Sequence, residues 1–139
     1  NEYGRLEMER FVKKHGFTHY KRNPHFPVNT VQIMRGAILT QRQGRLLEYI
    51  DTVYKNMWEQ RLKMDDPEVI ATALDHAGFD GAEILEGIKE QSVKDELLNN
   101  TTASVERGTF GSPTFYVGDE IYFGKDRLGA VEEEIENQK

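Results

Sequence analysis

Strand-forming sequence is confined to one place near the end of this chain. Residues 114–117 and 121–123 are rich in β-branched and aromatic side chains, and the turn-forming residues 118–120 separate them. Two such segments joined by a short turn predict a β-hairpin. An isolated two-stranded hairpin is marginally stable, and its unpaired edges favour pairing with further strands. The sequence therefore predicts that other strands of this sheet lie outside the 139 residues.

The rest of the chain predicts helices, because apolar residues recur at helical spacing between start and stop signals. Asp66 followed by Pro67 indicates an N-cap with proline at the first helical position. Ser92 and Asp95 have the spacing of a capping box, which predicts a helix start at Ser92. The expected helices span residues 1–16, 30–43, 46–58, 67–77, 80–88, 92–107 and 126–135.

Two further groups of side chains receive structural interpretations. Tyr54, Met57 and Trp58 lie at helical spacing and are expected in a core, with a minor role in a pocket as the alternative. The three histidines within residues 15–25 have no regularly spaced acidic or sulfur ligand beside them. No metal site is predicted from them.

Composition excludes several classes of function. The net charge is −6 and there is no basic stripe, which argues against nucleic acid as a partner. No apolar run approaches the length that spans a bilayer, and no membrane association is expected. The chain has no cysteine, so disulfides and thiolate zinc sites within it are excluded. The cytoplasm is the expected location.

The segment that carries chemistry is Gly-Thr-Phe-Gly-Ser-Pro-Thr-Phe-Tyr-Val, residues 108–117. Pro113 directly precedes a strand, where proline is confined to the first position. A cis Ser112–Pro113 bond would leave the main-chain N–H and C=O of Ser112 open to an extended peptide ligand. The alternative is an ordinary trans proline that enters an edge strand.

A second segment, Phe-Gly-Lys-Asp-Arg at residues 123–127, lies where the last helix is expected to begin. Exposed N–H groups at a helix start bind carboxylates, and the carboxylate of Asp126 beside them could hold an ammonium group. The two together would suit the zwitterionic end of an amino acid. The alternative is that Asp126 is simply the N-cap of that helix.

These two segments, in this order around a hairpin and before a last helix, resemble the C-terminal half of the DsbA-like branch of the thioredoxin superfamily. Residues 22–30, Arg-Asn-Pro-His-Phe-Pro-Val-Asn-Thr, followed by Met34 and Arg35, resemble 2-hydroxychromene-2-carboxylate isomerases. Kappa-class glutathione transferases are close relatives of those enzymes. The resemblance extends over essentially the whole chain.

The resemblance implies an α/β, thioredoxin-like fold with a helical insertion. Its N-terminal β-α-β part, with a serine that activates glutathione, would precede Asn1, and the chain would be mostly helical with a C-terminal hairpin. Residues 1–29 would lead out of the thioredoxin core, residues 30–91 would form the inserted helical domain, and residues 92–139 would complete the thioredoxin-like domain.

The resemblance also implies glutathione as the cofactor and assigns residues to it. The main chain of Ser112, before the cis Pro113, would pair with the cysteinyl part, and Lys125 and Asp126 would hold the γ-glutamyl end. Relatives often carry a small polar residue or glutamine at the position of Lys125. The residues that match a loop near the active site are Asn23, Phe26, Pro27 and Asn29.

The implied activity is glutathione-assisted cis–trans isomerisation of a small, ring-opened aromatic acid, in a homodimer. Two alternatives are a kappa-class-like glutathione transferase and a DsbA-like disulfide oxidoreductase whose active-site motif lies upstream. A further alternative is a thioredoxin-fold binding module without catalytic activity. The residue at the start of the first thioredoxin helix would separate them: serine for isomerase or transferase, cysteine for oxidoreductase, and neither for a binding module.

Overall fold

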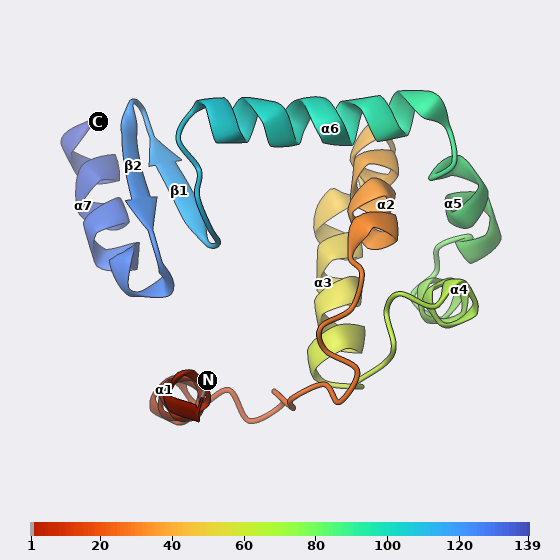
Figure 1. Ribbon diagram of the computed structural model, residues 1–139, viewed down its shortest axis with the longest axis horizontal. Helices are drawn as coiled ribbons and strands as arrows, with labels where there is room; N and C mark the ends of the chain where they lie inside the picture. Colours follow the sequence, from red (N-terminus) through yellow and green to blue (C-terminus); the bar gives the residue numbers. More distant parts are fainter. Residues whose placement is uncertain (1) are drawn as a thin grey trace. The chain divides into compact units, whose positions relative to one another are not determined.

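The computed structural model describes residues 2–139, which form helices and one small sheet (Figure 1). The elements are α1 (Glu2–His15), α2 (Val31–Arg42), α3 (Leu46–Trp58), α4 (Pro67–His76), α5 (Gly81–Gly87), α6 (Gln91–Glu106), β1 (Thr114–Val117), β2 (Glu120–Phe123), the 3-10 helix η1 (Lys125–Arg127) and α7 (Leu128–Asn137). The chain divides into two compact units, Asn1–Leu97 and Leu98–Lys139. This boundary falls inside α6, and the division at residues 29/30 and 91/92 stays a prediction.

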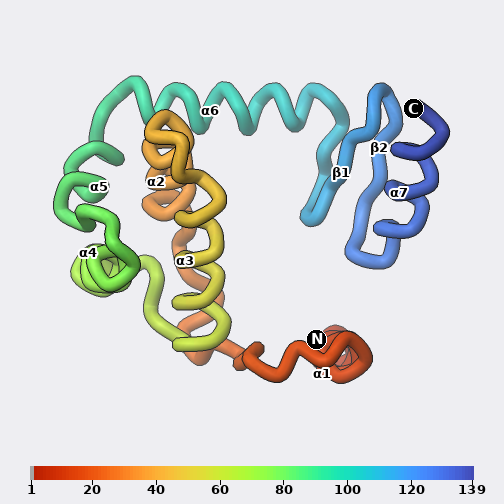
Figure 2. Tube along the Cα trace, turned by 180° about the vertical axis from the view of Figure 1, so that it is seen from behind, coloured from red at the N-terminus to blue at the C-terminus, as the bar shows by residue number. Residues whose placement is uncertain are grey.

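The first unit has an apolar core between α2, α3, α4 and α5. Helices α2 and α3 pack along each other, and α5 packs against both α4 and α2 (Figure 2). The buried members of this core are Ile33, Tyr49, Met57, Met64, Ile70, Ala73, Leu74, Phe79, Ile84 and Ile88.

Tyr49 lies at the centre of that core with 2% of its surface exposed. Its hydroxyl donates to the carbonyl of Ile33 at 2.8 Å, and its ring meets Phe79 edge-on at 5.9 Å. Burial raises the pKa of the phenol, which stays a neutral donor. Tyr54, expected in the core, is instead 63% exposed. The apolar stripe of α3 is wider than the face that α2 and α4 cover.

Helix α4 begins as the sequence predicts. The Asp66 side chain accepts a hydrogen bond from the N–H of Glu68 at 3.1 Å, and Pro67 occupies the first turn. The cap satisfies a donor that has no partner within the helix.

Replacing Asp66 by alanine should lower the free energy of unfolding by about 1 kcal/mol, because the first turn of α4 loses its cap. Asp66→Asn should keep most of the stability, since an asparagine oxygen caps equally well. Asp51→Ala, an exposed position within α3, is the matched control. Urea denaturation measures all three variants. A cost for Asp66→Ala no larger than that of Asp51→Ala would contradict the capping role.

The second unit contains the predicted hairpin. Strands β1 and β2 pair antiparallel, from Thr114 opposite Phe123 to Val117 opposite Glu120. Glu120, expected in the turn, is the first residue of β2, which leaves a two-residue turn of Gly118 and Asp119. Helix α7 packs against β1.

Two helix starts differ from the predictions. Helix α6 begins at Gln91, so Ser92 lies inside the helix and the expected capping box with Asp95 is wrong. The Ser92 hydroxyl instead accepts from Arg42 Nη1 at 3.5 Å. Helix α7 begins at Leu128, after η1, and no side chain caps its first turn. The interpretation of Asp126 as an N-cap is therefore wrong.

No helix within residues 2–139 combines the length and apolar character needed to cross a membrane.

Candidate functional site

The Ser112–Pro113 peptide bond is cis, as predicted. Ser112 is exposed, and within residues 2–139 its main-chain N–H and C=O make no hydrogen bond. The loop before it is held by Thr114, whose hydroxyl donates to the carbonyl of Gly111 at 2.7 Å. An exposed main-chain donor and acceptor are thus presented beside the start of β1.

The hairpin brings the second motif to the same place. The N–H of Gly124 donates to the carbonyl of Pro113 at 3.0 Å, one step beyond the last ladder pair, Thr114 and Phe123. Lys125 and Asp126 follow directly. Residues 112–113 and 125–126 therefore lie at one end of the hairpin, although more than ten positions separate them along the chain.

Lys125 and Asp126 form an ion pair at this end of the hairpin. Lys125 Nζ lies 2.7 Å from Asp126 Oδ1, and the Asp126 side chain is 74% exposed. An exposed ion pair contributes little to stability, because water screens both charges. The carboxylate can accept from a ligand ammonium group, and the ammonium of Lys125 can donate to a ligand carboxylate.

An aromatic pair, Phe110 and Phe123, lies beside the loop that leads to Ser112. The rings of Phe110 and Phe123 lie 4.7 Å apart, and Phe110 is largely exposed. A Cβ atom on Gly111 would come within 2.7 Å of the Phe123 ring. Any larger residue at position 111 would therefore displace that ring.

The loop assigned by sequence to the active-site region lies in the first unit, and Asn23 holds its shape. The Asn23 side chain is 1% exposed, and its Nδ2 donates to the carbonyls of Met57 at 2.8 Å and Leu62 at 2.7 Å. Its Oδ1 accepts from the N–H of His25 at 2.8 Å. The first two bonds tie the loop to the last turn of α3 and to the segment that follows it, and the third lies within the loop. Direct contact between Asn23 and a ligand stays a prediction.

The other residues of this loop are exposed. The Phe26 ring packs against Trp58 at 5.3 Å, and Phe26–Pro27 is a second cis bond, which the sequence did not predict. The Asn29 side chain accepts from the N–H of Val31 at 3.0 Å and thereby joins the loop to the start of α2. Of the predicted loop residues, Phe26, Pro27 and Asn29 are exposed to a ligand, whereas Asn23 is not.

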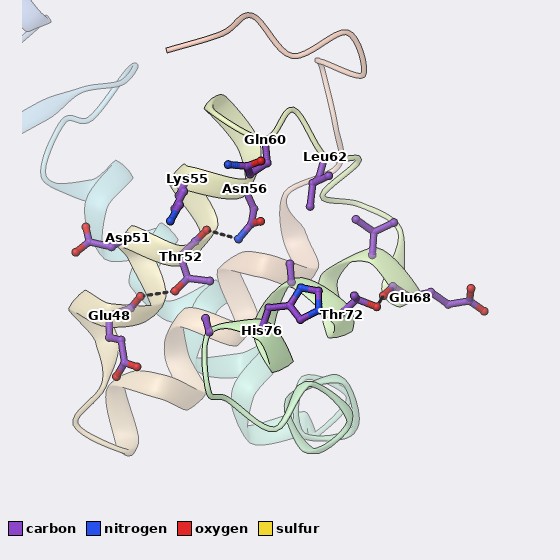
Figure 3. Close-up of a pocket in the computed structure, with 13 residues that line it drawn as sticks. Glu48, Asp51, Thr52, Lys55, Asn56, Gln60, Leu62, Glu68, Thr72 and His76 are labelled. Carbon is purple, nitrogen blue, oxygen red and sulfur yellow. Dashed lines mark hydrogen bonds between the residues drawn. The ribbon is translucent and has the colours of Figure 1, made fainter. Parts of the chain in front are cut away.

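A groove of about 970 Å³ lies between α3 and α4 (Figure 3). Its threonine and asparagine side chains are bonded to their own helices: Thr52 to the carbonyl of Glu48, Asn56 to that of Thr52, and Thr72 to that of Glu68, each at 2.8 Å. A ligand site needs polar groups that converge on one point. These groups are already bonded along separate helices, and the groove is a poor ligand site.

A second groove, of about 760 Å³, runs between the end of α1 and α3. Tyr54 and Trp58 line it, together with Phe17 and Tyr20 of the following loop. The exposure of Tyr54, which contradicts its expected place in the core, is explained by this groove. Sequence periodicity shows that such residues share a face but not whether another helix covers that face.

Comparison with known proteins gives consistent matches. The family model of the DSBA-like thioredoxin domain matches residues 7–136. The chain is 23% identical to a 2-hydroxychromene-2-carboxylate isomerase of Pseudomonas putida over 133 residues. This match covers 94% of this chain and 63% of the relative. A protein of the same name from Pseudomonas sp. strain C18 is 28% identical, and the match covers 79% of this chain and 53% of that protein. Another from Sphingobium xenophagum is 24% identical, over 69% of this chain and 49% of that protein.

A solved structure of a 2-hydroxychromene-2-carboxylate isomerase superposes with a TM-score of 0.85 at 20% identity, over 99% of this chain and 66% of that one. The predicted thioredoxin-like fold class is confirmed. The chain spans between about half and 63% of the length of the curated relatives it matches.

Proposed function

The chain belongs to the family of DsbA-like thioredoxin domains, and from this premise we propose that the full-length protein is a 2-hydroxychromene-2-carboxylate isomerase. The observation that carries the proposal is that all three matched relatives, from separate bacteria, bear this one name. The reaction would be the cis–trans isomerisation of a ring-opened aromatic acid. The likeness of fold supports the proposal without identifying the substrate.

We propose glutathione as the cofactor, and the residues at the end of the hairpin fit it. The unpaired N–H and C=O of Ser112 match the main-chain groups of a short peptide, which pairs with them as an added strand does. Lys125 and Asp126 offer one charge of each sign to the zwitterionic γ-glutamyl end. When bound, glutathione would supply a thiol nucleophile, which this cysteine-free chain lacks.

Replacing Asp126 by alanine should weaken glutathione binding by roughly ten- to a hundredfold, because one charge-assisted hydrogen bond is worth about 1.5–3 kcal/mol. Calorimetric titration of the full-length protein measures the effect. Asp119→Ala is the matched control, since Asp119 is exposed in the turn at the other end of the hairpin. Equal affinity for the wild type and Asp126→Ala, with unchanged folding, would remove Asp126 from the ligand site.

The activity is tested on the purified full-length protein with 2-hydroxychromene-2-carboxylate, with and without added glutathione, by following the absorbance of the conjugated acid. Conversion that requires glutathione is the expected result. Conversion at the same rate without glutathione would overturn the cofactor assignment. No conversion, together with thiol transfer to an electrophile or with disulfide exchange, would instead identify a transferase or an oxidoreductase.

We also propose that the protein is a cytoplasmic homodimer that takes a small aromatic substrate. The support is the likeness to the isomerases over this part of the protein. Light scattering of the full-length protein tests the dimer, and a monomer at micromolar concentration would overturn it. Cell fractionation tests the location, and recovery outside the cytoplasmic fraction would contradict it.

A further inference from the structure

Two arginines on one face of α2 differ in how their charges are satisfied. Arg35 and Arg42 are seven residues apart, which places them on the same side of the helix two turns from each other. Arg42 is partly exposed and reaches α6, where its Nη2 lies 2.6 Å from Glu96 Oε2. Arg42 therefore has an anionic partner.

Arg35 is more buried than Arg42 and has no anionic partner in the part of the chain that the structure describes. Its Nε is shielded from solvent and makes no hydrogen bond, and no ion pair joins its guanidinium to any residue within 2–139. A guanidinium carries five N–H donors and keeps its proton at any physiological pH. The Nε of Arg35 is removed from water without a partner while the residue stays partly exposed, so the guanidinium is accessible to an incoming anion that would also satisfy this donor.

The carboxylate of Asp65, a residue bonded to α2 through Gln32, already has partners. Asp65 receives Gln32 of α2 on its main-chain carbonyl, at 3.3 Å. Its side chain lies 3.0 Å from Lys63 Nζ and accepts from the N–H of Asn29 at 3.3 Å. The hydrogen bonds from Lys63 and Asn29 hold the pKa of the Asp65 carboxyl below its usual range, so Asp65 is charged. Its ion-pair partner is Lys63, and no ion pair within residues 2–139 joins it to Arg35.

Arg35 lies in the first part of α2, close in sequence to the loop of residues 23–29. It lies four residues after Val31, or about 6 Å along the helix axis. The loop of residues 23–29 leads directly into that first turn, and Asn29 is bonded to the N–H of Val31. The unpaired guanidinium thus follows closely on the loop that the family resemblance places at the active site.

We infer that Arg35 binds the carboxylate of a ligand. The flat guanidinium fork matches the geometry of a carboxylate, which it can bind through two parallel hydrogen bonds. Naming the ligand rests on the proposed function, which supplies two sources of this chemistry: the aromatic acid and glutathione. Neither carries a phosphate or sulfate group.

The test compares Arg35→Gln, Arg35→Lys and the control Arg42→Gln in the full-length protein. Calorimetry gives the Kd of each variant for glutathione and, separately, for 2-hydroxychromene-2-carboxylate, and thermal unfolding gives Tm. Arg35→Gln should weaken one ligand by roughly ten- to a hundredfold, the effect of losing a charged hydrogen bond. Arg35→Lys should recover part of that loss, and Arg42→Gln should change neither Kd by more than about twofold, since its partner is Glu96.

The ligand that is weakened identifies the source of the carboxylate. Unchanged Kd values for both ligands in Arg35→Gln would overturn the inference, whether or not Tm falls, and a fall in Tm with unchanged Kd values would assign Arg35 a structural role. The inference and the proposed function fail separately. Turnover by the wild type with no effect of Arg35→Gln defeats only the inference, whereas Arg35-dependent binding without turnover defeats only the proposed function.

Discussion

Replacing Asn23 by alanine should lower the free energy of unfolding by about 3 kcal/mol. The Asn23 amide group is buried and supplies donors to two main-chain carbonyls, those of Met57 and Leu62, and an acceptor to the N–H of His25. Alanine would leave these groups without their partner, and each buried polar group left unsatisfied costs about 1–3 kcal/mol. Water entering the space would recover part of this sum. Urea denaturation of the wild type and the variant measures the difference.

Two companion variants isolate the cause. Arg22→Ala changes the exposed neighbour of Asn23 and should alter stability by less than about 0.5 kcal/mol. Asn23→Asp keeps the size of the side chain but removes both donors and buries a carboxylate against two carbonyls, so it should destabilise at least as much as alanine. A loss below about 0.5 kcal/mol for Asn23→Ala would show that the three hydrogen bonds do not hold the loop.

Replacing Gly36 by alanine should cost about 2–4 kcal/mol, combining overpacking with the loss of a buried hydrogen bond. A Cβ atom at residue 36 would lie 2.1 Å from the Tyr49 hydroxyl oxygen and 2.7 Å from its Cζ. Tyr49 is buried and bonded to the carbonyl of Ile33, so it cannot move aside without breaking that bond. Thermal and urea unfolding measure the loss.

A double-mutant cycle tests this explanation. Tyr49→Phe removes the atom closest to the new methyl group, so the cost of Gly36→Ala should be smaller in a Tyr49→Phe background. Gly87→Ala is the matched control, because the closest atom there is the flexible end of Leu39. Additive costs in the cycle would show that the clash with Tyr49 does not explain the loss.

Local signals predicted the secondary structure well where a single residue determines an element's end. Pro67 after Asp66 correctly marked the start of α4, and the turn around Gly118 correctly marked the hairpin. Ser92 was wrongly predicted as a cap, because α6 already begins at Gln91, one residue before the Ser92–Asp95 capping-box pattern. Tyr54 failed as a core residue because its burial depends on which helices cover that side of α3, and periodicity does not contain this information.

In the candidate site, too, local features could be predicted from the sequence and tertiary contacts could not. The cis bond before Pro113 followed from a motif match, and the closeness of Lys125 to Pro113 follows from the hairpin register. The inward position of Asn23 and the isolation of Arg35 are tertiary properties, since each depends on which groups from distant segments come within hydrogen-bond reach. No spacing in the sequence distinguishes Arg35, without a partner, from Arg42, which has one.

The two-residue turn at Gly118 and Asp119 determines the geometry of a site at the opposite end of the hairpin. The length of the turn determines which residues of the two antiparallel strands lie opposite each other. With a two-residue turn, the N–H of Gly124 donates to the carbonyl of Pro113. One residue inserted between β1 and β2 would shift this pairing and turn each side chain of one strand to the other face of the sheet. Ser112 and Asp126 would then lose their common position although neither had been changed. Ligand binding should therefore tolerate substitution of Asp119, whereas it should not tolerate a change in the length of the turn.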